Sequence, residues 1–441
     1  MLRDLVLSLT FLACLGLTLR YPYAGVLTWA WLALMQPNRE IYGVITTTLR
    51  LNFLVAIVAI LAWFFSKGRK MPPLDGTLVV LSLFFIWMTF SSAVGVSPYN
   101  WYLWDRVWRI VALAVLIGAT ANSRVRIHGL IWVIVLSLMY FGVKGGILTL
   151  ISGGAMKSAG PGGTAIGDNN QLALALLMIL PLAFYLRRYS SNHFVRIGLT
   201  IAAVFTFLAV LGSYSRGAFL ALGALCILAW WRSRNKVLFP VLLLLVAYPA
   251  LHFMPQSFYD RMNTMNSLDD DGSFQGRVVA WKVAYYYARD HFPIGAGFSG
   301  AEQPFVFNYY FPGFSTHSAH SIYFQVLGDH GFIGLIMFLV ILVLAFVNCQ
   351  RIRKVTRNRP DLAWAADLAT MIQLSLLVYC IGGAALSLAY YDVPIIWYLL
   401  LPALLSLVRQ TKLQQSQVPE IREPHFGHPR PATAGAFVSN A

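Results

Sequence analysis

The sequence predicts an all-α polytopic integral membrane protein with about 12 transmembrane helices, and three observations support this fold class. Of its 441 residues, 58% are hydrophobic and only 11% are charged, whereas about a quarter of a soluble domain is charged. Apolar runs of about twenty residues, the length that crosses a bilayer, recur along the chain. The basic residues gather in short clusters between these runs.

The apolar runs give the candidate spans in chain order. The first run is long enough for one span followed by a shorter hydrophobic helix. Because no small-residue cleavage site precedes the next run, we interpret it as a retained span and not a signal peptide. The candidate spans are residues 5–36, 46–66, 77–95, 106–121, 129–150, 169–186, 194–212, 217–231, 237–252, 322–348, 363–388 and 393–409.

The basic clusters set the orientation of the spans. Cytoplasmic loops of membrane proteins carry an excess of Lys and Arg, and placing every cluster in the cytoplasm meets no exception from residue 66 onward. The net charge of +16 therefore reflects topology and not a nucleic-acid partner. The clusters are Lys67–Lys70, Arg124–Arg126, Arg187–Arg188, Arg232–Lys236 and Arg351–Arg359. The connections then expected on the outer face are residues 96–105, 151–168, 213–216 and 252–321.

The connection 252–321 is by far the longest and is expected to be a periplasmic loop. It holds six acidic and four basic residues, a net charge of −2, opposite in sign to the cytoplasmic clusters. Within it, Gly276–His291 shows a helical repeat of apolar residues, ended by Pro293 and the glycines that follow. The predicted organisation is one transmembrane domain, 1–412, and a polar, Pro-rich, disordered cytoplasmic tail, 413–441.

Three histidines stand at the start of the apolar run that follows this loop. Titratable side chains at such a position usually serve a site, and imidazole is a natural general base near neutral pH. His320 is the predicted catalytic base and His317 a possible helper, since three residues apart they would share a helix face. His330 and the glycines that follow it, Gly331 and Gly334, are expected to serve close helix packing.

No metal or other cofactor is predicted. A zinc site needs three or four ligands, and no Cys cluster or His-Glu pattern adds to the histidine pair. The four cysteines, Cys14, Cys226, Cys349 and Cys380, all lie in apolar runs and are interpreted as small buried hydrophobes.

Several cations are expected at the same outer face. Arg216 lies at the outer end of two spans and either snorkels or binds an anion, since a guanidinium pairs well with phosphate. Arg277 opens the loop helix with Trp281 one turn later, as part of a solvated amphipathic helix or of a substrate site. Lys144 is a weaker anion-binding candidate, for which snorkelling is favoured. Asp168 is expected to cap the span that follows it.

Two arginines and a histidine suit one kind of reaction. A lipid-anchored pyrophosphate leaving group needs positive charge as its bond breaks, and a hydroxyl acceptor needs a base for its proton. Both substrates would arrive in the outer leaflet, where no nucleotide is available.

The motifs that hold these residues resemble those of the O-antigen ligase and polymerase superfamily of bacterial inner-membrane enzymes. The most specific parts are Ser213–Gly217, Gly276–Trp281, and His320 followed by Gln325, Leu327-Gly328 and Gly331. Within the superfamily, Asp168–Leu174 and His320–Gln325 look most like the O-glycosylation ligases associated with the exosortase A system. The chain departs from many relatives in having Asp168-Asn169-Asn170 in place of Asn-Pro-Asn, and Ser321 in place of Asn.

The resemblance implies a metal-independent glycosyltransferase of C-type membrane architecture. Its donor would be an undecaprenyl-pyrophosphate-linked glycan and its acceptor a hydroxyl of a glycan or a protein. The family histidine falls on His320, as the base, and the family arginines fall on Arg216 and Arg277, as diphosphate-binding groups. His317, Lys144 and Trp281 are further substrate-binding candidates. The expected location is the bacterial inner membrane, with the active site facing the periplasm.

Two alternatives remain at this stage. One is a polymerase of the same superfamily, in which donor and acceptor are both lipid-linked. The other is a lipid-linked glycan transporter, with the arginines as a transit site. A transporter typically carries polar groups near the bilayer midplane, whereas here they gather at the outer rim, which favours an enzyme.

Overall fold

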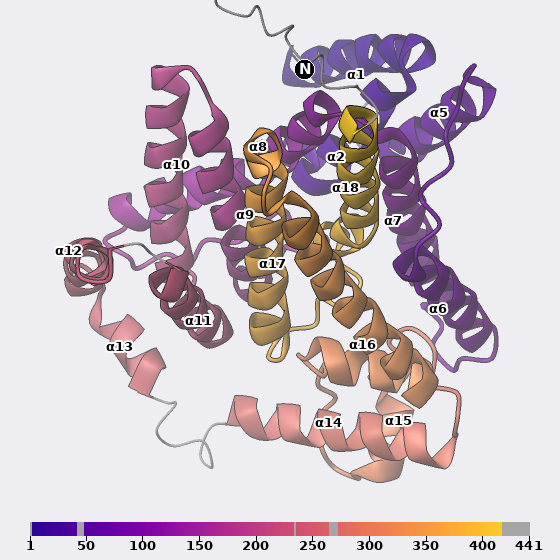
Figure 1. The fold of residues 1–441 in the computed structure, drawn as a ribbon. Helices are drawn as coiled ribbons and strands as arrows, with labels where there is room; N and C mark the ends of the chain where they lie inside the picture. Colours follow the sequence, from indigo (N-terminus) through magenta and orange to yellow (C-terminus); the bar gives the residue numbers. More distant parts are fainter. Residues whose placement is uncertain (1, 42–47, 233–234, 264–271, 417–441) are drawn as a thin grey trace, which may run out of the picture.

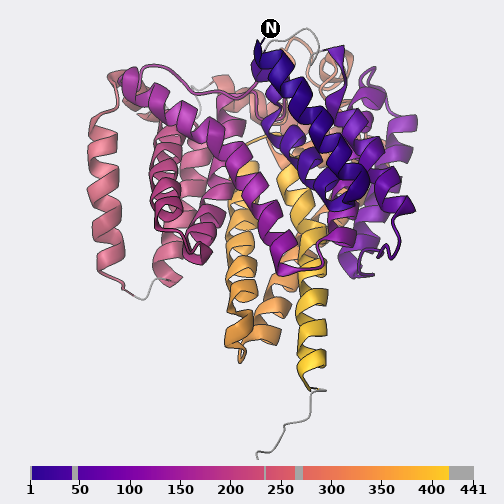
Figure 2. The ribbon, with the colours of Figure 1, turned by 90° about the horizontal axis from the view of Figure 1, so that it is seen from above.

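The computed structural model describes residues 2–41, 48–232, 235–263 and 272–416, and all their regular structure is helical (Figures 1 and 2). The predicted all-α polytopic fold is confirmed. The α-helices are α1 (Leu2–Arg20), α2 (Pro22–Met35), α3 (Pro37–Ile41), α5 (Leu51–Phe65), α6 (Gly76–Ala93), α7 (Asn100–Thr120), α8 (Arg124–Ile151), α9 (Asn169–Tyr189), α10 (His193–Leu211), α11 (Arg216–Arg232), α12 (Leu238–His252), α13 (Gln256–Asn263), α14 (Gly272–Asp290), α15 (Pro304–Tyr310), α16 (Ile322–Thr356), α17 (Ala363–Gly383) and α18 (Asp392–Ser416).

Eight helices among the described residues are long and apolar enough to cross a membrane: α1, α6, α8, α9, α10, α16, α17 and α18. Three shorter apolar helices, α2, α5 and α11, accompany them, so the predicted count of twelve is not established. The run 5–36 divides into α1 and α2, and Pro22 takes the first position of α2, where a missing N–H costs nothing.

The C-terminal boundary also differs in detail from the prediction. Helix α18 continues to Ser416, so residues 413–416 of the predicted tail are helical, and 417–441 lie outside the described residues.

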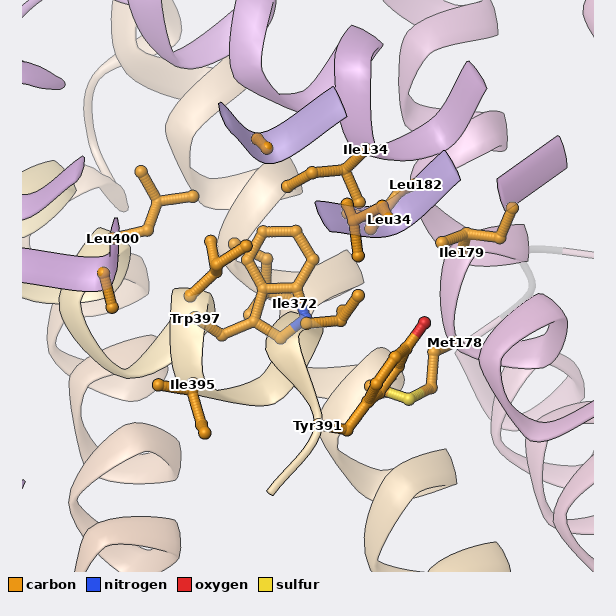
Figure 3. Packing of buried hydrophobic residues seen from close by; sticks show 14 of the residues in the cluster. Leu34, Ile134, Met178, Ile179, Leu182, Ile372, Tyr391, Ile395, Trp397 and Leu400 are labelled. Atoms are coloured by element: carbon orange, nitrogen blue, oxygen red, sulfur yellow. The ribbon is translucent and has the colours of Figure 1, made fainter. Parts of the chain in front are cut away.

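The core lies around α9, α17 and α18. Figure 2 shows the orange and yellow C-terminal helices between the N-terminal helices on one side and the pink α11–α12 region on the other. Trp397 of α18 is fully buried and is surrounded by apolar side chains of several helices, among them Leu34, Ile134 and Ile372 (Figure 3). Its indole N–H donates to the hydroxyl of Ser375, 3.2 Å away. One aromatic side chain thus joins α2, α8, α17 and α18.

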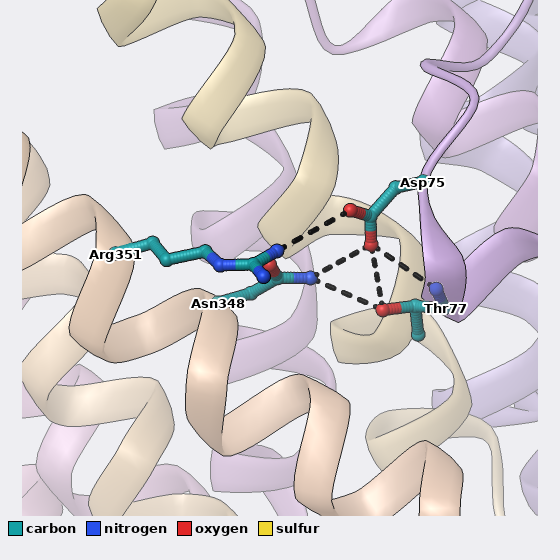
Figure 4. A network of polar contacts seen from close by, with 4 residues as sticks. All are labelled: Asp75, Thr77, Asn348 and Arg351. Carbon is teal, nitrogen blue, oxygen red and sulfur yellow. Dashed lines mark hydrogen bonds and ion pairs between the residues drawn. The ribbon is translucent and has the colours of Figure 1, made fainter.

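A polar network ties the start of α6 to α16 (Figure 4). Asp75 caps α6, accepting hydrogen bonds from the backbone N–H and the hydroxyl of Thr77 at 3.1 and 2.8 Å. The amide of Asn348 donates to the same carboxylate at 3.0 Å, and Arg351 lies 3.9 Å from it. Two of the basic clusters, Lys67–Lys70 and the one that begins at Arg351, therefore flank one network at the same end of the bundle.

Helix α16 is broken at Gly331, whose backbone has φ 68° and ψ −169°. The loop after α14 enters the break: the N–H groups of Ala296 and Gly297 donate to the carbonyls of Gly328 and Asp329, both at 2.8 Å. A Cβ on Gly331 would overlap the carbonyl oxygen of Pro293. The expectation of helix packing at Gly331 is therefore wrong, because the segment that approaches it is the chain's own loop and the residue supplies a positive φ.

We predict that Gly331→Ala strongly destabilises the fold. The substitution adds left-handed backbone strain to a steric overlap, together roughly 2–5 kcal/mol. Gly68→Ala is the matched control, because Gly68 has a similar φ of 77° with open space around its Cβ position. Melting temperatures in detergent should fall much further for Gly331→Ala than for Gly68→Ala, and equal shifts would contradict the packing of the loop into the break.

Candidate functional site

The connections predicted on the outer face lie together at one end of the bundle. Val96 donates its N–H to the carbonyl of Ala296 at 2.9 Å, which joins the first connection to the longest one. The Tyr214 hydroxyl donates to the carbonyl of Gly154 at 2.7 Å, which joins the other two. The longest connection carries α14 and α15, which lie below α16 in Figure 1. Arg216, Arg277 and His320 lie in these connections, so the fold brings them to the same end of the bundle.

His320 stands two residues before α16 in a strained backbone conformation. Its φ is 43°, a left-handed value that non-glycine residues rarely adopt and that clusters at functional sites. The preceding peptide is fixed by Trp281, whose indole N–H donates to the Ala319 carbonyl at 2.6 Å. The Nδ1 atom of His320 is buried and has no hydrogen-bond partner in the described part of the chain. Such an atom is suited to a substrate group.

Glu302 holds the segment that leads to His320. Its carboxylate accepts hydrogen bonds from the Ser318 hydroxyl at 3.1 Å and from the Ala319 N–H at 3.2 Å. Burial raises the pKa of Glu302, while these two hydrogen bonds act to lower it. Sequence reasoning counted Glu302 only among the loop charges. Its one distinguishing signal is that it is the only acidic residue between Asp290 and Asp329.

The charges around His320 favour its neutral form. Burial lowers the pKa of His320, and the Arg277 guanidinium lowers it further, whereas the Asp168 carboxylate raises it and His317 lowers it. The net pKa lies below the ordinary value of 6.5. At pH 7 the imidazole is therefore unprotonated, which is the form that a general base requires. The same interactions place Arg277, Asp168 and His317 near the ring.

His317 packs against the start of α14. A Cβ on Gly276 would lie 2.6 Å from His317 Cδ2, so glycine beside Arg277 makes room for the ring. Nδ1 of His317 lies 2.7 Å from the Ser315 carbonyl and donates to it, which leaves Nε2 as an acceptor. The premise that both histidines share a helix face is wrong, because α16 begins only at Ile322. Their proximity instead comes from the loop folding onto α14.

Arg216 begins α11 directly after a tight turn. Tyr214 in this turn has φ 58°, and the Ser215 hydroxyl accepts a hydrogen bond from the Ala218 N–H at 3.3 Å. The side chain of Arg216, which is half-buried, thus adds to the positive end of a helix dipole.

The end of α17 lies between Arg216 and His320. Gly217 packs there, since a Cβ built on it would lie 3.3 Å from Ala385 Cβ. Ile322 packs on the same end, 2.8 Å from a Cβ built on Gly383. The motif arginine and the motif histidine therefore flank one helix end.

The start of α9 connects the two motif segments. Asp168 caps α9 as predicted, accepting from the Asn170 N–H at 2.8 Å. The amide of Asn169 donates to the Ser213 carbonyl at 2.5 Å. Because Asp168 also acts electrostatically on His320, this helix start contacts the arginine turn and lies near the histidine.

The other candidate residues have partners of their own. Trp281 stacks on Phe324 with ring centres 5.1 Å apart, so its packing positions the backbone beside His320, and substrate contact by Trp281 stays a prediction. Lys144 forms an ion pair with Glu40 at 2.5 Å and lies near the Tyr140 ring. Its role as an anion contact also stays a prediction.

His330 and Asp329 are buried next to the break in α16. His330 Nδ1 lies 2.6 Å from the Ser91 hydroxyl, and its ring meets Phe298 edge to face, as expected for a packing residue. Asp329, which sequence reasoning did not single out, accepts from the Ser299 N–H and the Tyr390 hydroxyl, both at 2.9 Å. It fixes the loop in the break.

Metal ligands are not assigned at this site. Within the described ranges, no group of three or more His, Cys, Asp or Glu side chains is arranged to hold a metal ion.

Comparison with known families assigns most of the chain to two models. Residues 201–339 match a family described as O-antigen ligase, and residues 2–191 match a family of unknown function (DUF5935). No curated protein matches the chain significantly. The match at 201–339 contains all three motif residues Arg216, Arg277 and His320. The match therefore supports an O-antigen ligase domain at residues 201–339, in a multi-pass bacterial membrane protein. Membership of the exosortase-associated subgroup stays a prediction.

We predict opposite shifts of the His320 pKa from two substitutions. Arg277→Gln removes a cation that disfavours the imidazolium, so the pKa should rise, whereas Asp168→Asn removes a favouring anion, so it should fall. Histidine-labelled protein in detergent can be titrated by NMR, with His320→Gln assigning the resonance. Arg289→Gln, on the exposed end of the same helix α14, should leave the pKa unchanged. If all three variants titrate alike, Arg277 and Asp168 do not face His320.

Proposed function

We propose that this protein transfers a glycan from an undecaprenyl-pyrophosphate donor to an acceptor hydroxyl at the periplasmic face of the inner membrane. The observation that carries the proposal is His320: a strained, neutral imidazole with a buried Nδ1 that has no hydrogen-bond partner among the described residues, next to Arg277. The match to the O-antigen ligase family supports the coarser part, a membrane glycosyltransferase that uses a lipid-linked glycan.

In the proposed reaction, His320 takes the proton of the acceptor hydroxyl as the oxygen attacks the anomeric carbon of the donor sugar. The bond between that carbon and the phosphate oxygen breaks, and lipid pyrophosphate leaves with the bonding electron pair. The proton rests on the imidazole until it is lost to solvent. Removing a proton in this way typically accelerates a reaction 10²–10⁴-fold.

Arg216 and Arg277 are proposed to bind the diphosphate. Charge builds on the leaving oxygen in the transition state, and guanidinium groups held beforehand stabilise it without reorganisation. Arg216 stands at the positive end of α11 and Arg277 near the start of α14, so the diphosphate would lie between two helix starts. In this proposal the arginines supply the charge that a divalent cation supplies elsewhere.

The break in α16 is the one observation that favours the transporter alternative, because broken helices typically line transport sites. Here, however, the break is filled by the chain's own loop through two backbone hydrogen bonds and the Asp329 carboxylate. A transit path needs a break that faces a cavity. The geometry therefore supports an enzyme better.

We predict that His320→Gln lowers glycan transfer by about 10²–10⁴-fold while donor binding is largely kept. The assay uses purified protein in nanodiscs with a lipid-pyrophosphate glycan, measuring transfer and donor affinity separately. His291→Gln is the matched control, because His291 is an exposed histidine of the same connection. Near-normal transfer by His320→Gln would exclude the general-base role.

Arg216→Gln and Arg277→Gln should each weaken donor binding about tenfold or more, because each removes a charge-assisted hydrogen bond to phosphate. Arg289→Gln, which removes an exposed arginine of the same helix α14 paired with Asp290, should bind donor normally.

The products separate the two enzyme alternatives: a ligase gives one glycan on a new acceptor, and a polymerase gives a ladder of repeat lengths on the lipid.

A further inference from the structure

A polar cavity lies at the same end of the bundle, outside the His320 site. Its volume is about 410 Å³, within the range of small-molecule sites. It is formed by the end of α2, by α3, by the start of α5 and the two residues before it, by the first half of α7, by residues 163–164 and by the first residue of α18. All of its lining residues except Asp392 fall within the segment that matches the family of unknown function.

The cavity is rich in guanidinium groups. Four arginines line it against two carboxylates: Arg39, Arg50, Arg106 and Arg109, with Asp105 and Asp392. Arg109 is paired with Asp105 at 2.6 Å. Asp392 is 7% exposed and interacts electrostatically with Arg106 and Arg109. No ion pair within 4 Å joins Arg39, Arg50 or Arg106 to a carboxylate in the described part of the chain. The lining thus has an excess of positive charge at a membrane protein's surface.

The remaining lining is suited to hydroxyl groups. Gln36, Asn38 and Asn52 line the cavity together with the two acidic residues. The amide nitrogens of Gln36 and Asn52 donate to carbonyls of α2, and Asn52 Oδ1 is buried with no hydrogen-bond partner among the described residues. Tyr102, 70% exposed, stands at the edge. Carboxylate and amide oxygens accept a hydrogen bond from a sugar hydroxyl, and an amide N–H donates one to it. An exposed aromatic ring can cover a sugar face.

We propose that this cavity binds an anionic saccharide group, a sugar that carries a phosphate or a carboxylate. Arg50 and Arg106 pair with the anionic substituent, and the side-chain amides and Asp392 form hydrogen bonds with the sugar hydroxyls. The inference deepens the proposed function, because it makes an acidic sugar part of the acceptor or of the donor glycan.

The cavity and the His320 site share one segment of chain. Tyr390 donates to Asp329 beside the break in α16, and Asp392, two residues later, lines the cavity. A ligand in the cavity would therefore contact the segment that also holds the loop of the first site.

Saturation-transfer NMR tests the proposal on the full chain in phosphatidylcholine nanodiscs. The probes are glucose 6-phosphate, galacturonate and uncharged glucose. The two acidic sugars should give a signal, and glucose should bind at least about tenfold more weakly. Arg50→Gln and Arg106→Gln should each weaken the acidic probes about tenfold. Arg50 is exposed, so Arg50→Gln keeps the test valid if Arg106→Gln fails to fold. Arg289→Gln is the control and should bind normally.

Three outcomes would contradict the proposal, each in a distinct way, and a fourth would contradict only the proposed donor site. A signal lost only in Arg216→Gln and Arg277→Gln would place the acidic sugar in the first site, overturning this inference and leaving the proposed donor site intact. Equal binding of glucose would overturn the role of charge. Loss of the probe signal when the protein is placed in phosphatidylglycerol nanodiscs would make a lipid headgroup the occupant. That result would overturn the saccharide assignment. If Arg50→Gln and Arg106→Gln lose the probes while Arg216→Gln and Arg277→Gln bind lipid-pyrophosphate donor normally, the cavity stands and the proposed donor site fails.

Discussion

The candidate site depends on how the longest connection is anchored to the broken helix α16. Backbone N–H groups of Ala296 and Gly297 take the place of the helical hydrogen bonds that the chain gives up at Gly331. A helix broken at membrane depth must satisfy its exposed carbonyls internally. The loop does so, and Asp329 adds a side-chain bond to Ser299. Two backbone bonds and one side-chain bond thus hold the loop against α16.

The same connection also positions His320. Glu302 follows the anchored segment by a few residues and fixes Ser318 and Ala319, while Trp281 of α14 fixes the Ala319 carbonyl. Two parts of the same connection thus hold the residues just before His320, which supports its left-handed backbone. Strain of this kind persists only where surrounding contacts determine it. The imidazole is therefore positioned before any substrate binds.

The sequence was sufficient for the fold class and for the residues that carry unusual charge, but not for their supports. His320, Arg216 and Arg277 could be singled out because a titratable group at a membrane edge needs a reason to be there, and their catalytic and binding roles stay predictions. Glu302 and Asp329 could not, because their partners are backbone N–H groups and a hydroxyl brought near only by the tertiary fold. Gly331 was assigned to helix packing since a glycine in an apolar run looks the same whether a helix or a loop approaches it. The length of the run 5–36 did predict one span followed by a shorter helix, and the structure divides it at Tyr21 into α1 and α2; hydropathy alone does not place that boundary.

The arrangement of charge explains why the two basic regions should be separate sites. In the proposed reaction the base must be unprotonated, and burial lowers the pKa of His320 most, with Arg277 lowering it further. The more cations lie around one histidine, the lower its pKa and the weaker a base it becomes. Adding the arginines of the cavity beside His320 would therefore make His320 a weaker base. The groups that act on the pKa of His320 besides burial are Arg277, Asp168 and His317, and Asp168 offsets part of the effect of Arg277, whereas the arginines of the cavity lie beside Asp392. A site that must bind anions and also remove a proton is thus better built from two groups of cations than from one.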